Sequence, residues 1–446
     1  MKMPRISRRQ ALQIGTAAAT LPLVHIRTGR AAGKLTAGFW DHWIPGADDI
    51  LGKQVAAWGA KNQVDVKVDF ITSNGFKNLI TLTAEQQAKT GHDINYFPNF
   101  EGHNHAEALE PVDDVMKQLM DAHGPVLETN EYLYKIKGHW LAVPSSWGAQ
   151  DKGPCGRISI LKQAAGLDVV KMYPVAAVKT PEADAWTWEA HQKAAEACQK
   201  IGKTFGIGLG VTADSVDTIG GIMRAYGAAA VNSKGDVTLD TPEMDEVLTF
   251  GQRFVKAVTD DAVAYDDASN NRALISGDAA LIWNPPSAWA VAVRDNRPVG
   301  ADCWTFPSPK GPKGRIMPQN LTSWGIWSFS QNKSAAKELL AFLMTRAQVE
   351  ERSGPTQGYD LPPFKSMMDF KIWETVEPPP GTVYNYPIRA THELTPWISG
   401  MDAPPEVAVQ IYNRGTLPTM FAKLKTGQSI KQVKDWASGE IEGFLR

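Results

Sequence analysis

The fold class is decided by the stretch Val64-Asp65-Val66-Lys67-Val68-Asp69-Phe70, in which apolar and polar residues alternate. A period of two is typical of a β-strand with one buried face. Further strands are expected at 34–39 and 93–97, and the segments 47–61 and 74–89 between them have the apolar spacing of helices. Strands that alternate with helices of this length predict βαβ units, and therefore an α/β fold with mainly parallel sheets flanked by helices.

The alternation pauses at 138–147 and then resumes in a second α/β region that ends near 299. Within it we expect strands at 157–161, 205–209 and 279–283, and helices at 187–201, 219–226 and 241–258. The chain is expected to cross back at 302–307. After this crossing we expect a strand at 324–329, a helix at 335–345, an irregular Pro-rich segment over 355–405, and helices at 417–425 and 430–445.

Length and composition exclude several classes of protein. The 446 residues suggest two or three domains, and 43% hydrophobic with 21% charged residues provide for a full core. Lys and Arg total 46 against 48 Asp and Glu, a balance that argues against a nucleic-acid-binding protein. Three cysteines exclude a disulfide-built scaffold. The 15 tryptophans are an excess that predicts binding surfaces as well as core.

The N-terminal segment 1–32 has the features of an export signal. It holds six basic residues and no acid, and the pair Arg8-Arg9 precedes a mildly apolar stretch and a small-residue cleavage region. Paired arginines before a weak apolar region match the twin-arginine export signal. We therefore expect a soluble periplasmic protein that starts near Gly33. No cysteine precedes Cys155, so we expect no lipid anchor.

An oxidising compartment makes a disulfide possible. Cys198 lies in an expected helix and is interpreted as core. Cys155 and Cys303 each adjoin an expected crossing between domains, so a bond between them stays open, because sequence does not fix connectivity.

Four stretches carry a resemblance to a known family. They are Phe39-Trp40-Asp41-His42-Trp43; 89–97 with the acidic segment 109–114; 235–243 with 274–281; and 306–309 with 323–326 and the helix after them. In this order they resemble the family 1 extracellular solute-binding proteins of ABC importers, the group of the maltose-binding protein. Leu274 stands where that family usually has Phe.

This resemblance implies a two-lobed periplasmic-binding-protein fold of type II-like form, with a hinge and a cleft between the lobes. The expected lobes are discontinuous, 33–152 with 304–355 and 153–303 with 356–446. The implied function is capture of a sugar or oligosaccharide by lobe closure and its delivery to the permease of an ABC importer. We expect a monomer with no catalytic step, no cofactor and no metal.

Candidate ligand contacts follow the expected strands, since ligands of open α/β sheets bind beyond the carboxyl ends of strands. Trp rings pack on sugar rings, while carboxylates and amides bond their hydroxyls. We expect five rings to stack on the ligand, those of Trp40, Trp43, Trp147, Trp289 and Trp324. We expect five other residues to form hydrogen bonds with it: Asp41, Asn99, Glu101, Asn284 and Tyr359, with Ser146 beside them. Accordingly, Trp324→Ala is expected to weaken ligand binding without unfolding the protein.

Two alternatives remain open. A secreted carbohydrate-active enzyme requires two carboxylates that flank a glycosidic bond, and Asp41 and Glu101 are the candidates. The other is a binding protein for a non-sugar solute such as a polyol or a polyamine. The formal charge of −8 that remains after the basic segment 1–32 is removed would suit a cation. The acidic, His-containing segment 101–107 is interpreted as a solvated loop and not as a metal cluster.

Overall fold

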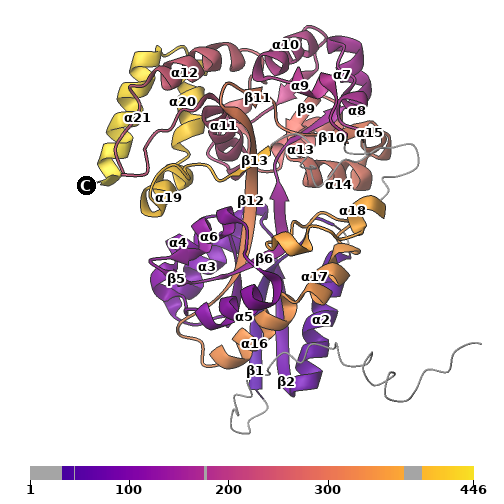
Figure 1. The fold of residues 1–446 in the computed structure, drawn as a ribbon, viewed down its shortest axis with the longest axis vertical. Helices are drawn as coiled ribbons and strands as arrows, with labels where there is room; N and C mark the ends of the chain where they lie inside the picture. The colour runs from indigo at the N-terminus through magenta and orange to yellow at the C-terminus, as the bar shows by residue number, and fades with distance from the viewer. Residues whose placement is uncertain (1–32, 45, 175–177, 376–393, 446) are drawn as a thin grey trace, which may run out of the picture.

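The computed structural model describes residues 33–44, 46–174, 178–375 and 394–445, so the expected export signal with Arg8 and Arg9 lies outside the described residues. The chain forms two lobes, one above the other in Figure 1, with the long strands β6 (Val143–Asp151) and β12 (Gly314–Ile326) running between them. This arrangement confirms the expected α/β fold with two lobes.

The first lobe is built on a seven-stranded sheet. In it β1 (Gly33–Trp40) pairs in parallel with β2 (Val64–Ile71) and β3 (Ile94–Pro98), and β12 runs antiparallel to β3 and β6. Helix α2 (Ala47–Asn62) buries Leu51, Val55 and Trp58 against this sheet, as their spacing along one helix face predicts. The other helices of this lobe are α3 (Lys77–Ala88), α4 (Glu101–Asn104), α5 (Asp113–His123), α6 (Glu128–Tyr134), α16 (Lys333–Leu343), α17 (Arg346–Ser353) and α18 (Ile372–Thr375).

The second lobe contains a four-stranded sheet in the order β10 (Cys303–Thr305), β7 (Pro154–Arg157), β9 (Ala279–Trp283) and β8 (Thr204–Gly206). Around it lie α7 (Ile158–Ala165), α8 (Val169–Met172), α9 (Pro181–Asp184), α10 (Trp188–Gln199), α11 (Ala213–Tyr226), α12 (Pro242–Phe254), α13 (Ser269–Ser276), α14 (Pro285–Asp295) and α15 (Arg297–Ala301). The C-terminal α19 (Pro405–Asn413), α20 (Thr416–Lys425) and α21 (Ile430–Leu445) return to this lobe (Figure 1).

The strand β12 joins the two lobes. Its first residues pair with β11 (Lys310–Gly311) and β13 (Leu394–Trp397), its last residues pair with β3, and a register shift interrupts its pairing with β6 between Asn320 and Thr322. The return crossing therefore lies at 314–326 and not at 302–307, because β10 pairs inside the second sheet. The segment 361–364 stays with the first lobe, where Leu361 N–H donates to Ala149 O at 2.9 Å.

Two local expectations differ from the structure. Both sheets are mixed and not mainly parallel, since β7 and β10 pair antiparallel in the second sheet. The strand expected at 157–161 is the helix α7. The Asp302 carboxylate accepts the N–H of Ser159 at 2.8 Å, and the carbonyl of Asp302 accepts the N–H of Ile158 at 2.7 Å. These bonds satisfy free amides at the start of the helix.

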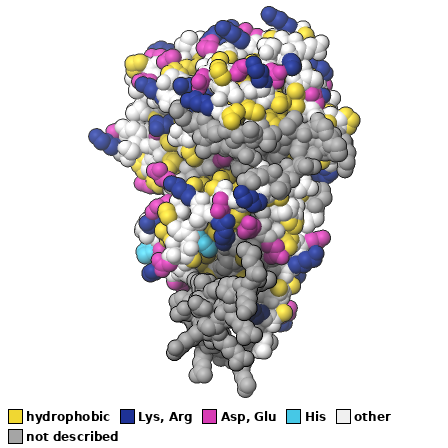
Figure 2. All heavy atoms as spheres, turned by 45° about the vertical axis from the view of Figure 1, so that its right-hand side comes forward, with side chains coloured by type: hydrophobic (Ala, Val, Ile, Leu, Met, Phe, Trp, Pro, Cys, Tyr) yellow, Lys and Arg dark blue, Asp and Glu magenta, His cyan; other side chains and the backbone are white. Residues whose placement is uncertain are grey.

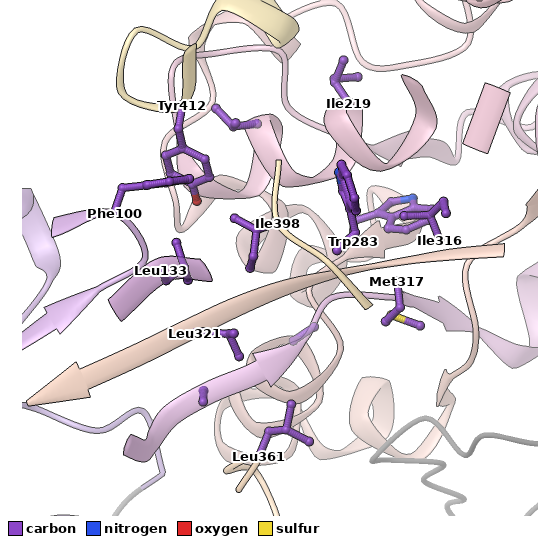
Figure 3. Close-up of a cluster of buried hydrophobic side chains, with 14 of the residues drawn as sticks. Phe100, Leu133, Ile219, Trp283, Ile316, Met317, Leu321, Leu361, Ile398 and Tyr412 are labelled. Carbon is purple, nitrogen blue, oxygen red and sulfur yellow. The ribbon is translucent and has the colours of Figure 1, made fainter. Parts of the chain in front are cut away.

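A continuous core extends between the lobes. Figure 3 shows Ile316, Met317 and Leu321 projecting from β12 among side chains of both lobes, with Phe100 beside Tyr412. Phe100 directly precedes α4, Tyr412 belongs to α19, and the centroids of their two rings lie 5.1 Å apart. On the face displayed in Figure 2, acidic and basic side chains are interspersed, as the nearly balanced composition leads one to expect.

The three cysteines are free thiols buried in the second lobe, so the disulfide left open between Cys155 and Cys303 is not formed. These two residues lie on the paired strands β7 and β10. A hydrogen bond with Cys303, together with burial, raises the pKa of the Cys155 thiol well above its ordinary value. Cys198 is buried in α10, as expected.

Candidate functional site

A cavity of about 360 Å³ lies between the lobes. The first lobe contributes the ends of β1 and β3 and the start of α3, and the second lobe contributes the start of α11 and parts of α13, α14 and α19. Its volume is in the range of small-molecule sites. The cavity thus lies where carboxyl ends of strands from one lobe meet helices of the other.

The first-lobe wall is aromatic and rests on a rigid base. The ring of Trp40 stacks on Tyr96 at 5.9 Å and meets Trp43 edge-on at 6.1 Å. Beneath it, a Cβ on Gly148 would come within 2.9 Å of the Trp40 ring, and Gly148 has φ +83°, so only glycine fits there. Asp360 accepts the Gly148 N–H at 2.8 Å. The wall is therefore preorganised.

Asn99 and Tyr412 connect the lobes at the edge of the cavity. Asn99 follows β3 with φ 45°, a left-handed conformation that Asn tolerates better than most residues. Its Nδ2 donates to Asn320 Oδ1 at 2.8 Å and to Tyr412 Oη at 2.9 Å. A second bridge joins Asn413 Nδ2 to Asn104 Oδ1 at 2.8 Å. The structure therefore holds the lobes in direct contact.

A buried charge cluster forms the floor near α11. Lys152 Nζ lies 2.6 Å from Asp214 Oδ1 and 2.9 Å from Asp217 Oδ2. Asp214 and Asp217 are three residues apart, so they lie on one face of α11. The two carboxylates raise the pKa of Lys152 despite its burial, so the ammonium stays charged. Burial raises the pKa of Asp217 to about 6, and Lys152 opposes this effect.

The wall opposite the aromatic residues is acidic and rich in amides. Asp214 Oδ2 accepts from Asn270 Nδ2 at 2.8 Å and from Asn284 Nδ2 at 3.4 Å. Partial burial and the neighbouring Asp214 raise the pKa of Asp267 to about 6. No hydrogen-bond or ion-pair partner of Asp267 occurs among the described residues. Its carboxylate is exposed to the water of the cavity.

Six of the eleven expected ligand contacts line this cavity: Trp40, Trp43, Asn99, Glu101, Asn284 and Tyr359. Asp41 is exposed outside it. Ser146, Trp147, Trp289 and Trp324 are at most 2% exposed and lie in the core. Trp147 Nε1 donates to the Trp40 carbonyl at 2.8 Å, and Trp324 packs 5.1 Å from Phe39. The structure does not support ligand contact by these five residues.

Two of the three buried tryptophans lie on the crossing strands, and Trp289 lies on α14. Trp147 lies on β6 and Trp324 on β12, and every residue of β6 is buried. Gly148 and Gln150 of β6 and Asn320 of β12 do line the cavity, whereas the rings of Trp147 and Trp324 are buried in the core. Position near an expected strand end therefore identified Trp40 and Trp43 but could not separate them from Trp147 and Trp324.

Several cavity residues were not predicted from the sequence. Lys152 was missed because lysine is normally solvent-exposed. The spacing of Asp214 and Asp217 after the Thr212 cap, whose Oγ1 accepts from Ser215 N–H at 3.2 Å, was the available signal. The cavity lining also includes Ser73, Asn78, Tyr96, Gln150, Thr212, Asp267, Asn271, Ser287, Asn320 and Tyr412.

The enzyme alternative loses its carboxylate pair, because Glu101 lines the cavity and Asp41 does not. Glu101 lies 3.4 Å from His105 Nε2, on the short helix α4. Within the described ranges, no group of three or more His, Cys, Asp or Glu side chains is placed to hold a metal ion. In the same part of the chain, no helix combines the length and apolar character that a membrane span requires.

Comparison with known proteins places this geometry in context. Residues 53–379 match the family model described as bacterial extracellular solute-binding protein. The fold is similar to maltose-bound MalE3 of T. maritima (TM-score 0.67, 18% identity, 93% of this chain and 100% of that chain). It is also similar to a solute-binding protein of Thermotoga lettingae bound to α-D-tagatose (TM-score 0.71, 16% identity, 93% and 100%).

A third similar structure is the GacH receptor of Streptomyces glaucescens, solved unliganded and with acarbose (TM-score 0.65, 17% identity, 93% of this chain and 98% of that chain). At these identities the likeness concerns the fold. No curated protein sequence matches the chain significantly.

Proposed function

Because the chain belongs to the bacterial extracellular solute-binding protein family, we propose that it captures a sugar or oligosaccharide between its lobes and delivers it to the permease of an ABC importer. Residues 1–32 would direct it to the periplasm by the twin-arginine route, where it would act as a soluble monomer without a lipid anchor. The solved structures named above, with maltose, tagatose or acarbose in their titles, support a carbohydrate.

The observation that carries this proposal is the composition of the cavity. Its aromatic wall, Trp40, Trp43, Tyr96 and Tyr359, faces a wall of carboxylates and amides that includes Asn284. Sugars present apolar C–H faces and polar hydroxyl rims, and this combination of surfaces suits both. We propose that Trp40, Trp43 and Tyr359 contact the ring faces, and that Glu101 and Asn284 bond hydroxyl groups.

Lobe closure is the second part of the proposal. The bridges from Asn99 to Tyr412 and from Asn413 to Asn104 join the lobes beside the crossing strands, together with a bond from Tyr132 Oη to the carbonyl of Ala403 at 2.9 Å. Rotation about such strands is a common hinge motion around ligands. Breaking these contacts between the lobes would open the cavity for entry, and reforming them over a ligand would close it.

The experiment is a titration of the purified protein with a panel of sugars, oligosaccharides, polyols and polyamines, followed by intrinsic Trp fluorescence and calorimetry. A saturable response to saccharides, with the compound recovered unchanged by chromatography, is the expected result. A response to polyols or polyamines alone would contradict the sugar assignment. Steady consumption of an oligosaccharide would contradict a binding protein and favour the enzyme.

A further inference from the structure

The charges that line the cavity are not balanced. Of the cavity-lining residues that the structure describes, Lys152 is the single Lys or Arg, whereas Glu101, Asp214 and Asp267 are acidic. Lys152 is already paired with Asp214 and with the buried Asp217 behind it. The positive charge of Lys152 is therefore used within the protein. Lys152 lowers the pKa of Asp267 at longer range, but no cation among the described residues forms an ion pair with the Asp267 carboxylate.

Closure over a ligand makes this imbalance matter. In the unliganded cavity water solvates Asp267, which is exposed. A ligand that fills about 360 Å³ displaces that water. Burying an ionised carboxylate is unfavourable unless it is paired and hydrogen-bonded. A neutral hydroxyl donates one hydrogen bond and no charge, whereas an ammonium supplies three donors and the missing positive charge.

The amides of the same wall point to donors on the ligand as well. Asn284 presents Nδ2 to the Asp214 carboxylate, which only accepts, so its Oδ1 must be the free end. Among the residues that the structure describes, Asn284 Oδ1 and Asn271 Oδ1 have no hydrogen-bond partner, and the two residues are 5% and 6% exposed. Both residues line the cavity. Free acceptors in a buried wall call for N–H or O–H donors.

The facing aromatic wall is compatible with a cation. Trp40, Trp43, Tyr96 and Tyr359 present ring surfaces to the cavity, and the faces of such rings attract ammonium groups. A neutral sugar would use these rings but leave Asp267 uncompensated. A simple polyamine would pair with Asp267 but make little use of a broad stacking surface.

We propose that the solute of this cavity is an amino sugar, a saccharide with a free protonated amine that pairs with Asp267 and bonds the oxygens of Asn271 and Asn284. This inference rests on the proposed function and narrows its substrate class.

The test compares glucosamine, N-acetylglucosamine and glucose, and the β-1,4-linked disaccharide of each, by isothermal titration calorimetry at pH 7.5. Within each set the sugars differ at one substituent, which is a protonatable amine in the first and a neutral group in the others. We expect the free amine to bind at least tenfold more tightly than its neutral partners. Spermidine is included as an amine without a sugar ring.

Matched variants assign the effect to one carboxylate. D267N should weaken binding of the amino sugar about tenfold and should leave the affinity for any neutral sugar within twofold of the unsubstituted protein. D266N removes the same charge one residue away, from a side chain that is 59% exposed and paired with Arg272 outside the cavity, and should change neither. If D267N fails to fold, the unsubstituted protein is titrated at 50 and at 500 mM NaCl. The higher salt should weaken binding of the amino sugar but not of the neutral sugars, since salt screens the charged contact.

The outcomes separate the two proposals. Neutral sugars that bind as tightly as the amine, or a D267N variant that weakens both alike, would overturn the amino-sugar inference and leave sugar capture standing. Spermidine binding without a response to any saccharide would overturn both. Silence from the whole set would overturn the amino-sugar inference, and the wider panel would then decide sugar capture.

Discussion

Replacing Trp324 by Ala separates a core role from a ligand-binding role. The ring is fully buried on β12, 5.1 Å from Phe39 between centroids, with the guanidinium carbon of Arg352 5.6 Å from its centre. Removing a buried Trp side chain costs about 3–5 kcal/mol, because the cavity left behind does not collapse completely. For a cooperative unit of about 150–250 residues, each kcal/mol lowers Tm by about 2–4 °C. We therefore expect Trp324→Ala to lower Tm by roughly 6–20 °C.

The matched control is Trp43→Ala. Trp43 is half-buried, lines the cavity and meets Trp40 edge-on at 6.1 Å. It should lose at least tenfold in affinity for the saccharide that responds in the panel, with a much smaller change in Tm. The assays are differential scanning calorimetry and calorimetric titration at a temperature where each variant is folded. A Trp324→Ala protein with unchanged Tm and weakened binding would refute the placement of this ring in the core.

Three further substitutions probe other parts of the structure. Lys152→Met leaves Asp214 and Asp217 without their buried cation and should lower the unfolding free energy by about 3–5 kcal/mol in urea; a loss below 1 kcal/mol would contradict this pairing. Tyr412→Phe removes the acceptor for Asn99 Nδ2 and should increase the unliganded radius of gyration in solution scattering, an unchanged value counting against the bridge. Burial raises the pKa of Asp151 to about 6, so the folded protein holds a proton between about pH 4 and 6 that the unfolded chain releases, and stability falls as pH rises through this window. Asp151→Asn should therefore stabilise the protein more at pH 7.5 than at pH 4.5, and equal effects at both would exclude this titration.

The sequence predicted the first lobe well because its signals are local. The alternation over 64–70 predicts a strand with one less exposed face, and Val64, Val66 and Val68 are half-buried while Asp65 and Lys67 are exposed. Val55 and Trp58 are buried on α2, as their spacing predicts. The strand expected at 157–161 was wrong, because Asp302 accepts the N–H groups of Ile158 and Ser159 and these bonds start a helix there. A partner this far away in the sequence cannot be inferred from the pattern of residues at 157–161.

The same distinction explains the site. Strand-end reasoning found Trp40, Asn99 and Asn284, since the ends of β1, β3 and β9 do reach the cavity. It could not find Asp267 or Lys152, because their proximity depends on how two lobes meet. From residue type alone, Asp267 and Lys152 are both expected to be exposed to solvent. The assembled cavity shows that the Asp267 carboxylate has no ion-pair partner among the described residues.

The long reach of β12 has a consequence for how the chain is made. Ser323 Oγ donates to the carbonyl of Phe97, its neighbour in the paired strand β3, across 226 residues of sequence. At a synthesis rate of about 5–20 residues per second, roughly 10–45 s pass between the two strands leaving the ribosome. During that interval β3 has an open edge, and the sheet of the first lobe lacks β12. A newly made chain therefore needs protection from aggregation until its last third has been translated.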